Sequence, residues 1–205
     1  MNKIVTISRE FGSGGRELGR RLAEGLGFAY YDQEIIVEIA QRTKLAEDYV
    51  QQIIESRPSF SFPIHIGVTF QISSNELFRQ KATVFAEQCK LLKELSEKSD
   101  CVIVGRCADY ILRHYNPFRI FVYAGMERKM ERCRLKGKSE KNLSEKELKR
   151  CILSVDKRRA EYYSFATGQP WGEKRNYDIC LNSTNMTIKD ISPYIVQMLS
   201  GSVWQ

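Results

Sequence analysis

The residues best suited to chemistry lie near the start of the chain, where the β-branched run Val5–Ser8 breaks into glycines and then resumes with helical spacing. Glycines let backbone N–H groups curl around an anion, and the positive end of the following helix dipole points at the same place. The pattern therefore predicts a phosphate-binding loop with Gly12, Ser13, Gly14 and Gly15 as its donors. A glycine-rich turn that binds nothing is the alternative.

The loop departs from the P-loop sequence G-x-x-x-x-G-K-[ST]. Glu10 or Arg9 stands where the first glycine belongs. If Gly15 is the last glycine, Arg16 takes the place of the lysine and Glu17 that of the magnesium-binding hydroxyl. Arginine can neutralise phosphate through a bidentate fork, and a carboxylate is an oxygen donor that Mg²⁺ accepts. We therefore expect Arg16 at the phosphates and Glu17 as a candidate metal ligand.

Composition narrows the class of protein. The 205 residues are 42% hydrophobic and 28% charged, which suits one globular domain, 1–205. No apolar run approaches the ~20 residues that span a bilayer, and the first residues lack the apolar stretch of a signal peptide, so we expect a cytoplasmic protein without a membrane partner. A net charge of +7 favours an anionic partner. Nucleic acid is disfavoured because no motif that reads it is recognisable.

Strand-like and helical segments alternate along the chain, which predicts a parallel sheet covered by helices on both faces. Strand patterns occur at 4–8, 28–31, 101–105, 119–124 and 177–181. Helical patterns occur at 16–26, 34–42, 46–55, 75–99, 108–114, 127–135, 144–165 and 188–199, with a capping box at Ser144 and Glu147. The aromatic stretch 57–74 has no clear period, so it is a substrate-covering loop, a packed excursion or a dimer surface.

A second junction carries a resemblance to a known family. The buried run Cys101–Val104 ends in Gly105-Arg106, which puts a guanidinium at the edge where open α/β sheets bind ligands. With the glycine loop, this resembles the nucleoside monophosphate kinases, most closely the bacterial cytidylate kinases and their relatives. The resemblance implies a three-layer α/β P-loop NTPase-type fold with a five-stranded parallel sheet. Arg106 matches the arginine that holds the acceptor nucleotide, and the acidic partner is displaced to Asp109.

The resemblance continues along the chain. It implies a helical insertion on the acceptor side at 33–100 and a lid region at 136–172, with a mobile tip around 137–142. Arg128 resembles an arginine on the ATP side, and Arg159, with Arg158 as the alternate, resembles a lid arginine that closes over phosphates. A further lid arginine is absent, because Leu153 occupies its position. Asp32 falls where the family places an acidic residue near the acceptor phosphate and the metal, and the alternative is an N-cap for the next helix.

Together these matches imply an ATP-dependent phosphotransferase that uses Mg²⁺ and acts on nucleoside monophosphates, with CMP or dCMP favoured. The resemblance implies Arg16, Asp32, Arg106 and Arg159 as catalytic residues. ATP would be bound by residues 12–17, Arg128 and Arg158. The acceptor would be bound by Asp32, Arg106 and Asp109, and the metal by Glu17 or Asp32. Tyr162, Tyr163 and Trp171 could stack on a base or belong to the core. The missing lysine, hydroxyl and lid arginine leave a non-catalytic nucleotide-binding protein, or a kinase of another small molecule, as alternatives. A homodimer is possible.

Overall fold

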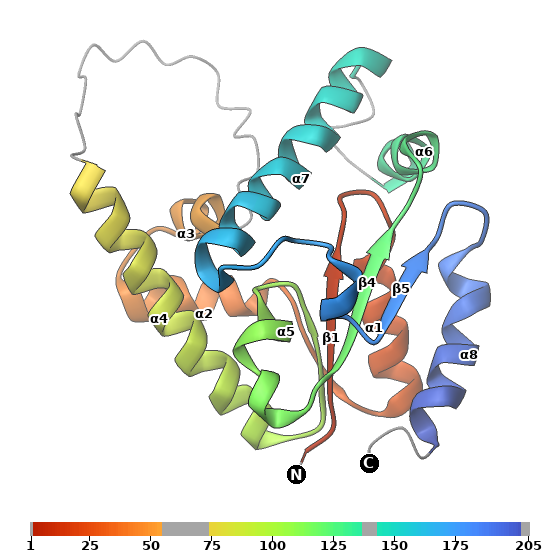
Figure 1. Cartoon of the computed structure of the whole chain (residues 1–205), viewed down its shortest axis with the longest axis horizontal. Helices are drawn as coiled ribbons and strands as arrows, with labels where there is room; N and C mark the ends of the chain where they lie inside the picture. The colour runs from red at the N-terminus through yellow and green to blue at the C-terminus, as the bar shows by residue number, and fades with distance from the viewer. Residues whose placement is uncertain (1, 55–73, 137–142, 202–205) are drawn as a thin grey trace.

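The computed structural model describes residues 2–54, 74–136 and 143–201 and contains one parallel sheet with the strand order β2-β3-β1-β4-β5 (Figure 1). The strands are β1 (Ile4–Arg9), β2 (Ala29–Tyr31), β3 (Cys101–Val104), β4 (Phe118–Tyr123) and β5 (Ile179–Asn182). The helices are α1 (Gly15–Leu26), α2 (Glu34–Thr43), α3 (Glu47–Ile54), α4 (Ser74–Lys98), α5 (Ala108–Ile111), α6 (Met126–Lys136), α7 (Glu145–Thr167) and α8 (Ile188–Ser200). Short 3-10 turns span Arg113–Tyr115 and Lys174–Asn176. The predicted three-layer α/β fold is confirmed.

Alternating side chains of the central strands supply two hydrophobic clusters, one on each face of the sheet. Val5 and Ile7 of β1 pack with residues of α1 and α8. Ile4 joins the other cluster, which contains residues of α2, α3, α4 and α5. Helices on both faces bury the central strands β1 and β3, which explains why both are almost uniformly apolar in sequence. These central strands therefore offer only their ends for binding.

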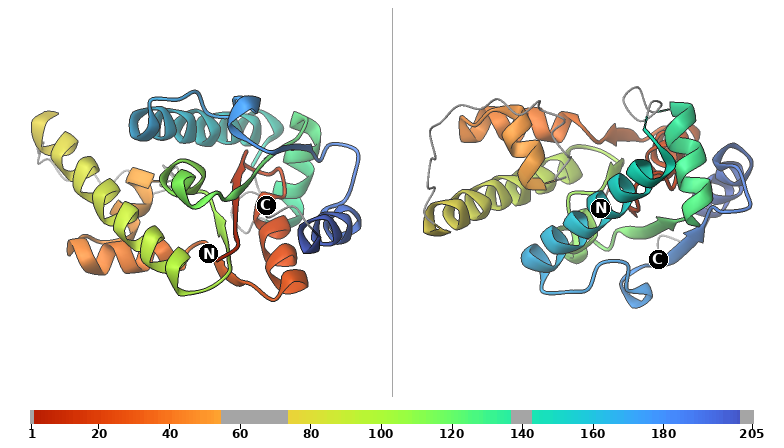
Figure 2. Two further views of the ribbon diagram at one scale, coloured as in Figure 1. Left: turned by 60° about the horizontal axis from the view of Figure 1, so that its bottom comes forward. Right: turned by 90° about the horizontal axis from the view of Figure 1, so that it is seen from above.

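The strands all end at one edge of the sheet. After two neighbouring strands, the chain continues on opposite faces of the sheet. β1 continues into α1 on one face of the sheet, whereas the adjacent β3 continues into α5 on the other face. Such a switch point opens a crevice at the carboxyl ends of the strands. Helix α7 lies over this edge, as the view from above in Figure 2 shows.

Helix boundaries follow the local sequence closely. α7 begins after Ser144, whose hydroxyl accepts a hydrogen bond from the Glu147 N–H while the Glu147 carboxylate accepts one from the Ser144 N–H, so the predicted capping box is confirmed. α1 begins at Gly15, one residue earlier than the sequence pattern predicts. The expected helix at 108–114 is instead a short α-helix followed by a 3-10 turn.

Several expectations concern parts of the chain that the structure leaves out. The aromatic stretch lies outside the described residues except for its last residue, and so does the tip at 137–142. The subdivision into an insertion and a lid region stays a prediction. None of the described helices combines the length and apolar character needed to cross a membrane.

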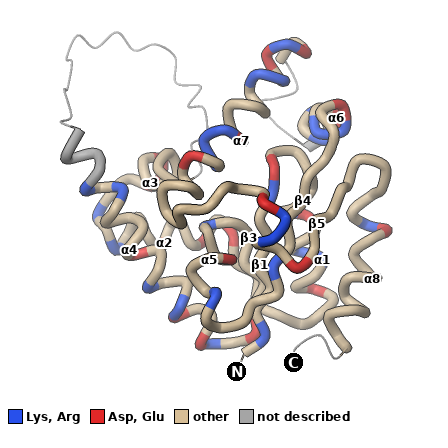
Figure 3. The backbone as a smooth tube through the Cα atoms, in the orientation of Figure 1, with Lys and Arg blue, Asp and Glu red and all other residues tan. Residues whose placement is uncertain are grey.

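The net positive charge is spread over several helices. Lys and Arg alternate with Asp and Glu along α4 and α7 (Figure 3). Only α6, with the sequence MERKMERCRLK, is strongly basic among the surface helices described here. The charge of +7 therefore does not by itself mark a nucleic-acid surface, and the expected lack of a nucleic-acid partner stays a prediction.

Candidate active site

The glycine loop between β1 and α1 is held open by left-handed glycines. Gly12 and Gly14 have φ angles of 75° and 90°, and Gly14 is the N-cap residue of α1. The carbonyl oxygen of Ser13 accepts hydrogen bonds from Arg132 Nη1 at 3.0 Å and Ser183 Oγ at 2.7 Å. These bonds anchor the loop from the side of α6 and β5, while the N-terminus of α1 presents its positive dipole end at the edge of the sheet.

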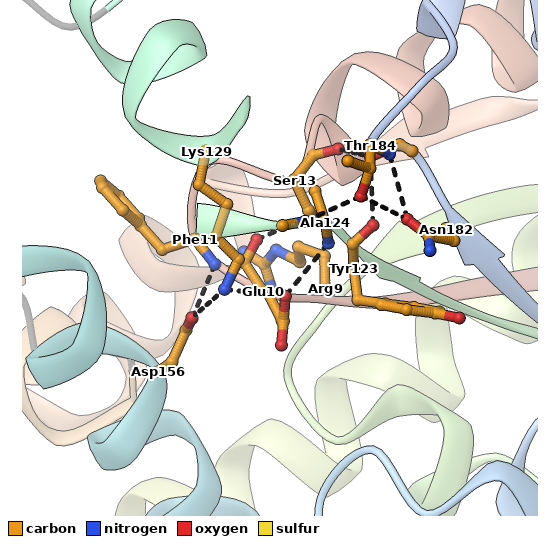
Figure 4. A network of polar contacts seen from close by, with 12 residues as sticks. Arg9, Glu10, Phe11, Ser13, Tyr123, Ala124, Lys129, Asp156, Asn182 and Thr184 are labelled. Carbon is orange, nitrogen blue, oxygen red and sulfur yellow. Dashed lines mark hydrogen bonds and ion pairs between the residues drawn. The ribbon is translucent and has the colours of Figure 1, made fainter. Parts of the chain in front are cut away.

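The first half of the loop is tied to α6 and α7 by a buried ionic network (Figure 4). Lys129 Nζ lies 2.8 Å from Glu10 Oε2 and 2.9 Å from Asp156 Oδ2. The Phe11 N–H donates to Asp156 Oδ1 at 2.6 Å, and the Ala124 N–H donates to Glu10 Oε2 at 3.2 Å. Burial raises the pKa of Asp156 above its usual range, and the Lys129 charge opposes that rise. The network joins the loop to the helix that carries Arg159.

Asp32 is the centre of a cluster of guanidinium groups at the end of β2. Its carboxylate pairs with Arg16, lies 3.7 Å from Arg9 Nη2 and lies 4.0 Å from Arg106 Nη2. Arg106 Nη2 also donates to the Asp32 carbonyl oxygen at 3.2 Å. The Tyr30 hydroxyl lies 3.4 Å from the same carboxylate, and burial followed by the Asp32 charge raises the pKa of Tyr30 to about 12.

The start of α2 bears on the predicted role of Asp32 as a helix cap. The N-cap of α2 is Gln33, so the alternative that Asp32 caps this helix is wrong. The reason is geometric, because α2 begins at Glu34, two residues after Asp32, and the Asp32 carboxylate contacts guanidinium groups instead. Asp32 instead brings three arginines from three separate elements to one point.

Arg106 is placed by an unusual turn at the end of β3. Gly105, Arg106 and Cys107 have consecutive φ angles of 78°, 60° and 52°. A left-handed conformation costs roughly 1–2 kcal/mol for each non-glycine residue, so other contacts must hold the turn. The buried Gln88 donates from Nε2 to the Arg106 carbonyl oxygen at 2.7 Å, and the Tyr162 hydroxyl donates to Gln88 Oε1 at 3.3 Å. Such stored strain is found mostly at functional sites.

A cleft of about 380 Å³, counting its open mouth, lies at the switch point of the sheet. Arg159 of α7 enters it and donates from Nη1 to the Arg9 carbonyl oxygen at 3.0 Å. The lining combines guanidinium groups with aromatic rings, as expected for a planar anionic ligand. It consists of Ser8, Arg9, Ile54, Gly105, Arg106, Cys107, Arg159, Tyr162, Tyr163 and Trp171. Tyr162 and Tyr163 are thus both core residues and part of the cleft wall.

Asp109 lies beneath this cleft rather than in its lining. Only 4% of the residue is exposed; its carboxylate accepts hydrogen bonds from Ser8 Oγ at 3.4 Å and from the Tyr163 hydroxyl at 2.7 Å. Burial raises the pKa of Asp109, and these two hydrogen bonds oppose the rise. Asp109 supports two residues of the wall, and its predicted direct contact with an acceptor stays a prediction.

Other predicted residues have partners away from the cleft. Arg128 pairs with Glu131 on its own helix, with Nη1 and Oε2 at 2.5 Å. Arg158 donates to the Ser154 carbonyl oxygen at 3.2 Å, whereas its neighbour Arg159 reaches the cleft. The structure therefore favours Arg159 over Arg158 as the arginine that α7 contributes. Glu17 pairs with Arg21 Nε at 3.0 Å.

These partners bear on the predicted magnesium ligands. Asp32 already faces guanidinium groups on several sides, and Glu17 is paired on its own helix. Within the described part of the chain, no group of three or more acidic, histidine or cysteine side chains is placed to hold a metal ion. Both carboxylates are thus engaged by arginines, although carboxylate oxygens are donors that Mg²⁺ accepts. Glu17 and Asp32 as ligands stay a prediction.

Four residues of the site escaped the sequence analysis: Lys129, Arg132, Gln88 and Arg9, of which Arg9 was noted only as standing where the first P-loop glycine belongs. Lys129 and Arg132 looked like surface charges, yet both are at most 9% exposed. Their spacing of three puts them on one face of a helix with Cys133, and a cysteine on a basic face could have signalled burial. Gln88 carries no comparable signal, since a lone glutamine in a helix is ordinary.

Comparison with known proteins identifies the group to which this site belongs. The sequence profile of the cytidylate kinase-like family matches residues 4–185, which include the glycine loop, the Arg106 turn and Arg159. The chain belongs to the cytidylate kinase-like family. No curated protein sequence matches it.

Solved structures agree with this cytidylate kinase-like fold. A protein described as uncharacterized, from Eubacterium ventriosum, superposes with a TM-score of 0.69 at 24% identity, covering 98% of this chain and 100% of that one. Shikimate kinase from Acinetobacter baumannii gives a TM-score of 0.56 at 14% identity over 100% and 97% of the two chains. A gluconokinase from Sinorhizobium meliloti gives 0.54 at 11% identity over 97% and 91%. At these identities the likeness shows the fold alone.

Proposed function

We propose that this cytidylate kinase-like protein transfers the γ-phosphoryl group of ATP to a nucleoside monophosphate, with CMP or dCMP as the favoured acceptor. The observation that carries the proposal is the convergence of Arg9, Arg106 and Arg159 on one cleft beside the glycine loop. Phosphoryl transfer requires mainly that two phosphates be held in line and that their charge be neutralised. Guanidinium groups from β1, the β3 turn and α7 meet that requirement.

Each side of the site has a distinct task in this proposal. The backbone donors of residues 12–15 and the N-terminus of α1 bind the phosphates of ATP. Arg106 holds the acceptor phosphate, and Arg159 draws α7 toward the cleft and excludes water. The acceptor oxygen is already anionic, so no general base is needed. Mg²⁺ would enter as part of the ATP complex, and no step here depends on a metal held by the protein.

Asp32 has a defined task in the absence of substrate. Its carboxylate holds Arg9 and Arg106, which line the cleft, close to Arg16, which does not; without it these like charges would repel each other. Incoming phosphates offer the same guanidinium groups a stronger acceptor. Binding would therefore exchange one anion for another without a large change of geometry, which favours fast assembly of the site.

A panel of acceptors tests the proposal. ADP release would be followed with CMP, dCMP, UMP, AMP and GMP, and with shikimate and gluconate because kinases of those compounds share the fold. Turnover of CMP or dCMP above all others supports the proposal. Turnover of a sugar or hydroxy acid would make the chain a kinase of another small molecule. Nucleotide binding without turnover of any acceptor would support the non-catalytic alternative.

A further inference from the structure

We infer that Arg9 supplies the positive charge that lysine supplies in an ordinary P-loop, and that Gly15 is a glycine because the Arg9 side chain occupies its space. The inference rests on the proposed phosphotransfer function. It makes Arg9, rather than Arg16, the cation at the ATP phosphates. Two positions of the motif have in effect exchanged their side chains.

The start of α1 sets the register of the motif. Because Gly14 is the left-handed N-cap and Gly15 the first helical residue, the loop ends at Gly14. The pattern G-x-x-x-x-G-K-[ST] then places its first glycine at Arg9 and its lysine at Gly15. Arg16 falls at the hydroxyl position, which agrees with its pairing to Asp32 outside the cleft lining.

The space around Gly15 explains why no side chain is present there. A Cβ added to Gly15 would lie 2.9 Å from Arg9 Cγ and closer still to Arg9 Cβ. Gly15 is not among the residues with a positive φ, so its backbone conformation does not require glycine. Glycine in place of alanine costs a helix about 1 kcal/mol. The arginine accounts for this otherwise unfavourable choice.

The Arg9 side chain carries its charge to the edge of the sheet where the strands end and the cleft lies. Arg9 shares the face of β1 that packs on α1, since it follows Val5 and Ile7 at intervals of two. From there it passes over the end of the sheet to Gly105, where a Cβ would collide with Nη1, and to Asp32. The side chain is 9% exposed and its residue lines the cleft. A cation held in this way faces any phosphate bound between the loop and Arg106.

An exchange of the two side chains tests the inference. The probes are inorganic tripolyphosphate, which reports on phosphate binding without a base, and ATP, both titrated by calorimetry. Arg9→Ala should weaken tripolyphosphate binding by about tenfold or more. Gly15→Lys alone should lower the melting temperature, because Arg9 fills the space. The double variant Arg9→Gly with Gly15→Lys rebuilds the ordinary motif and should regain most of both losses.

The control variant is Arg42→Ala, which removes a surface arginine paired with Glu38 and Glu94 and should leave tripolyphosphate binding within about twofold. Wild-type affinity in Arg9→Ala, or a double variant no better than Gly15→Lys, would overturn the inference. If Arg9→Ala fails to fold, the tripolyphosphate affinity and melting temperature of the double variant alone test the inference. If the wild-type chain binds tripolyphosphate but phosphorylates no acceptor, the proposed function is refuted. The tripolyphosphate affinities of the variants still test the role of Arg9 in that case. A wild-type chain that binds neither probe overturns both.

Discussion

Replacing Lys129 by methionine should destabilise the protein, because it removes the cation of the network that ties the loop to α6 and α7. Methionine keeps the length and apolar stem of lysine but leaves Glu10 and Asp156 without their shared cation. Removing one member of a buried ion pair typically costs about 3–5 kcal/mol. The Glu10 side chain is 26% exposed, so water will offset part of the loss. We expect a decrease of about 2–3 kcal/mol in the free energy of unfolding.

The expected change can be measured by urea unfolding and by calorimetry. For a chain of this size, 1 kcal/mol corresponds to about 2–4 °C in melting temperature, so Lys129→Met should melt roughly 4–12 °C lower. Lys90→Met is the matched control. Lys90 is 65% exposed and pairs with Glu87 three residues earlier, and such a pair contributes about 0–1 kcal/mol.

The pH dependence of stability provides an independent check on the Lys129→Met variant. Burial already raises the pKa of Asp156, and Lys129 restrains that rise. Without Lys129 the folded-state pKa rises further above the unfolded value of about 3.9. A carboxyl whose pKa is raised on folding loses stability as pH increases through that range. The deficit of Lys129→Met should thus be smaller at pH 4 than at pH 8. A deficit equal to that of Lys90→Met, or one independent of pH, would refute a buried ionic network.

Three further variants extend the test to the rest of the site. Arg106→Ala should lower kcat/KM for the acceptor found in the panel by about 100-fold or more, because it removes the buried guanidinium that we propose holds the acceptor phosphate; steady-state kinetics at saturating ATP measures this. Asp109→Asn should gain stability relative to wild type as pH rises from 4 to 7, since the raised pKa of Asp109 makes its ionisation unfavourable in the folded state; paired urea titrations at each pH measure this. Gly12→Ala should lower the free energy of unfolding by about 2–4 kcal/mol, because φ is 75° and the added Cβ would lie 2.8 Å from the Lys129 carbonyl oxygen; thermal unfolding measures this.

The fold could be predicted from the sequence because its elements are locally determined. Period-two and period-3.6 patterns placed all five strands and the main helices within a few residues. The exception near residue 110 has a local cause. Helix α5 begins at Ala108, as predicted, but ends at Ile111, and the left-handed residue Asn116 ends the 3-10 turn that follows. The spacing of hydrophobic residues does not reveal which residues adopt a left-handed backbone conformation.

The residues alone made the candidate site predictable where its side chains follow a strand, whereas Arg159 of α7 was predicted from the family resemblance. Arg106 follows the buried strand β3 by one glycine and Asp32 directly follows the half-buried strand β2, and the parallel sheet brings both to one edge. Lys129 and Arg132 come from a helix whose charges look like those of any solvated helix, and their burial depends on α7 and β5, which are distant in sequence. The register of the loop was also out of reach, because it depends on where α1 begins in space.

The left-handed turn at Gly105, Arg106 and Cys107 links two properties, thermal stability and catalytic activity. Glycine relieves the local backbone penalty at either non-glycine position. A laboratory selection for heat resistance would gain this relief at position 107 without removing a cation of the site, whereas glycine at position 106 would also remove the buried guanidinium beside Asp32. Selection that rewards turnover should instead retain arginine there and seek compensating substitutions near Gln88, whose amide braces the bend.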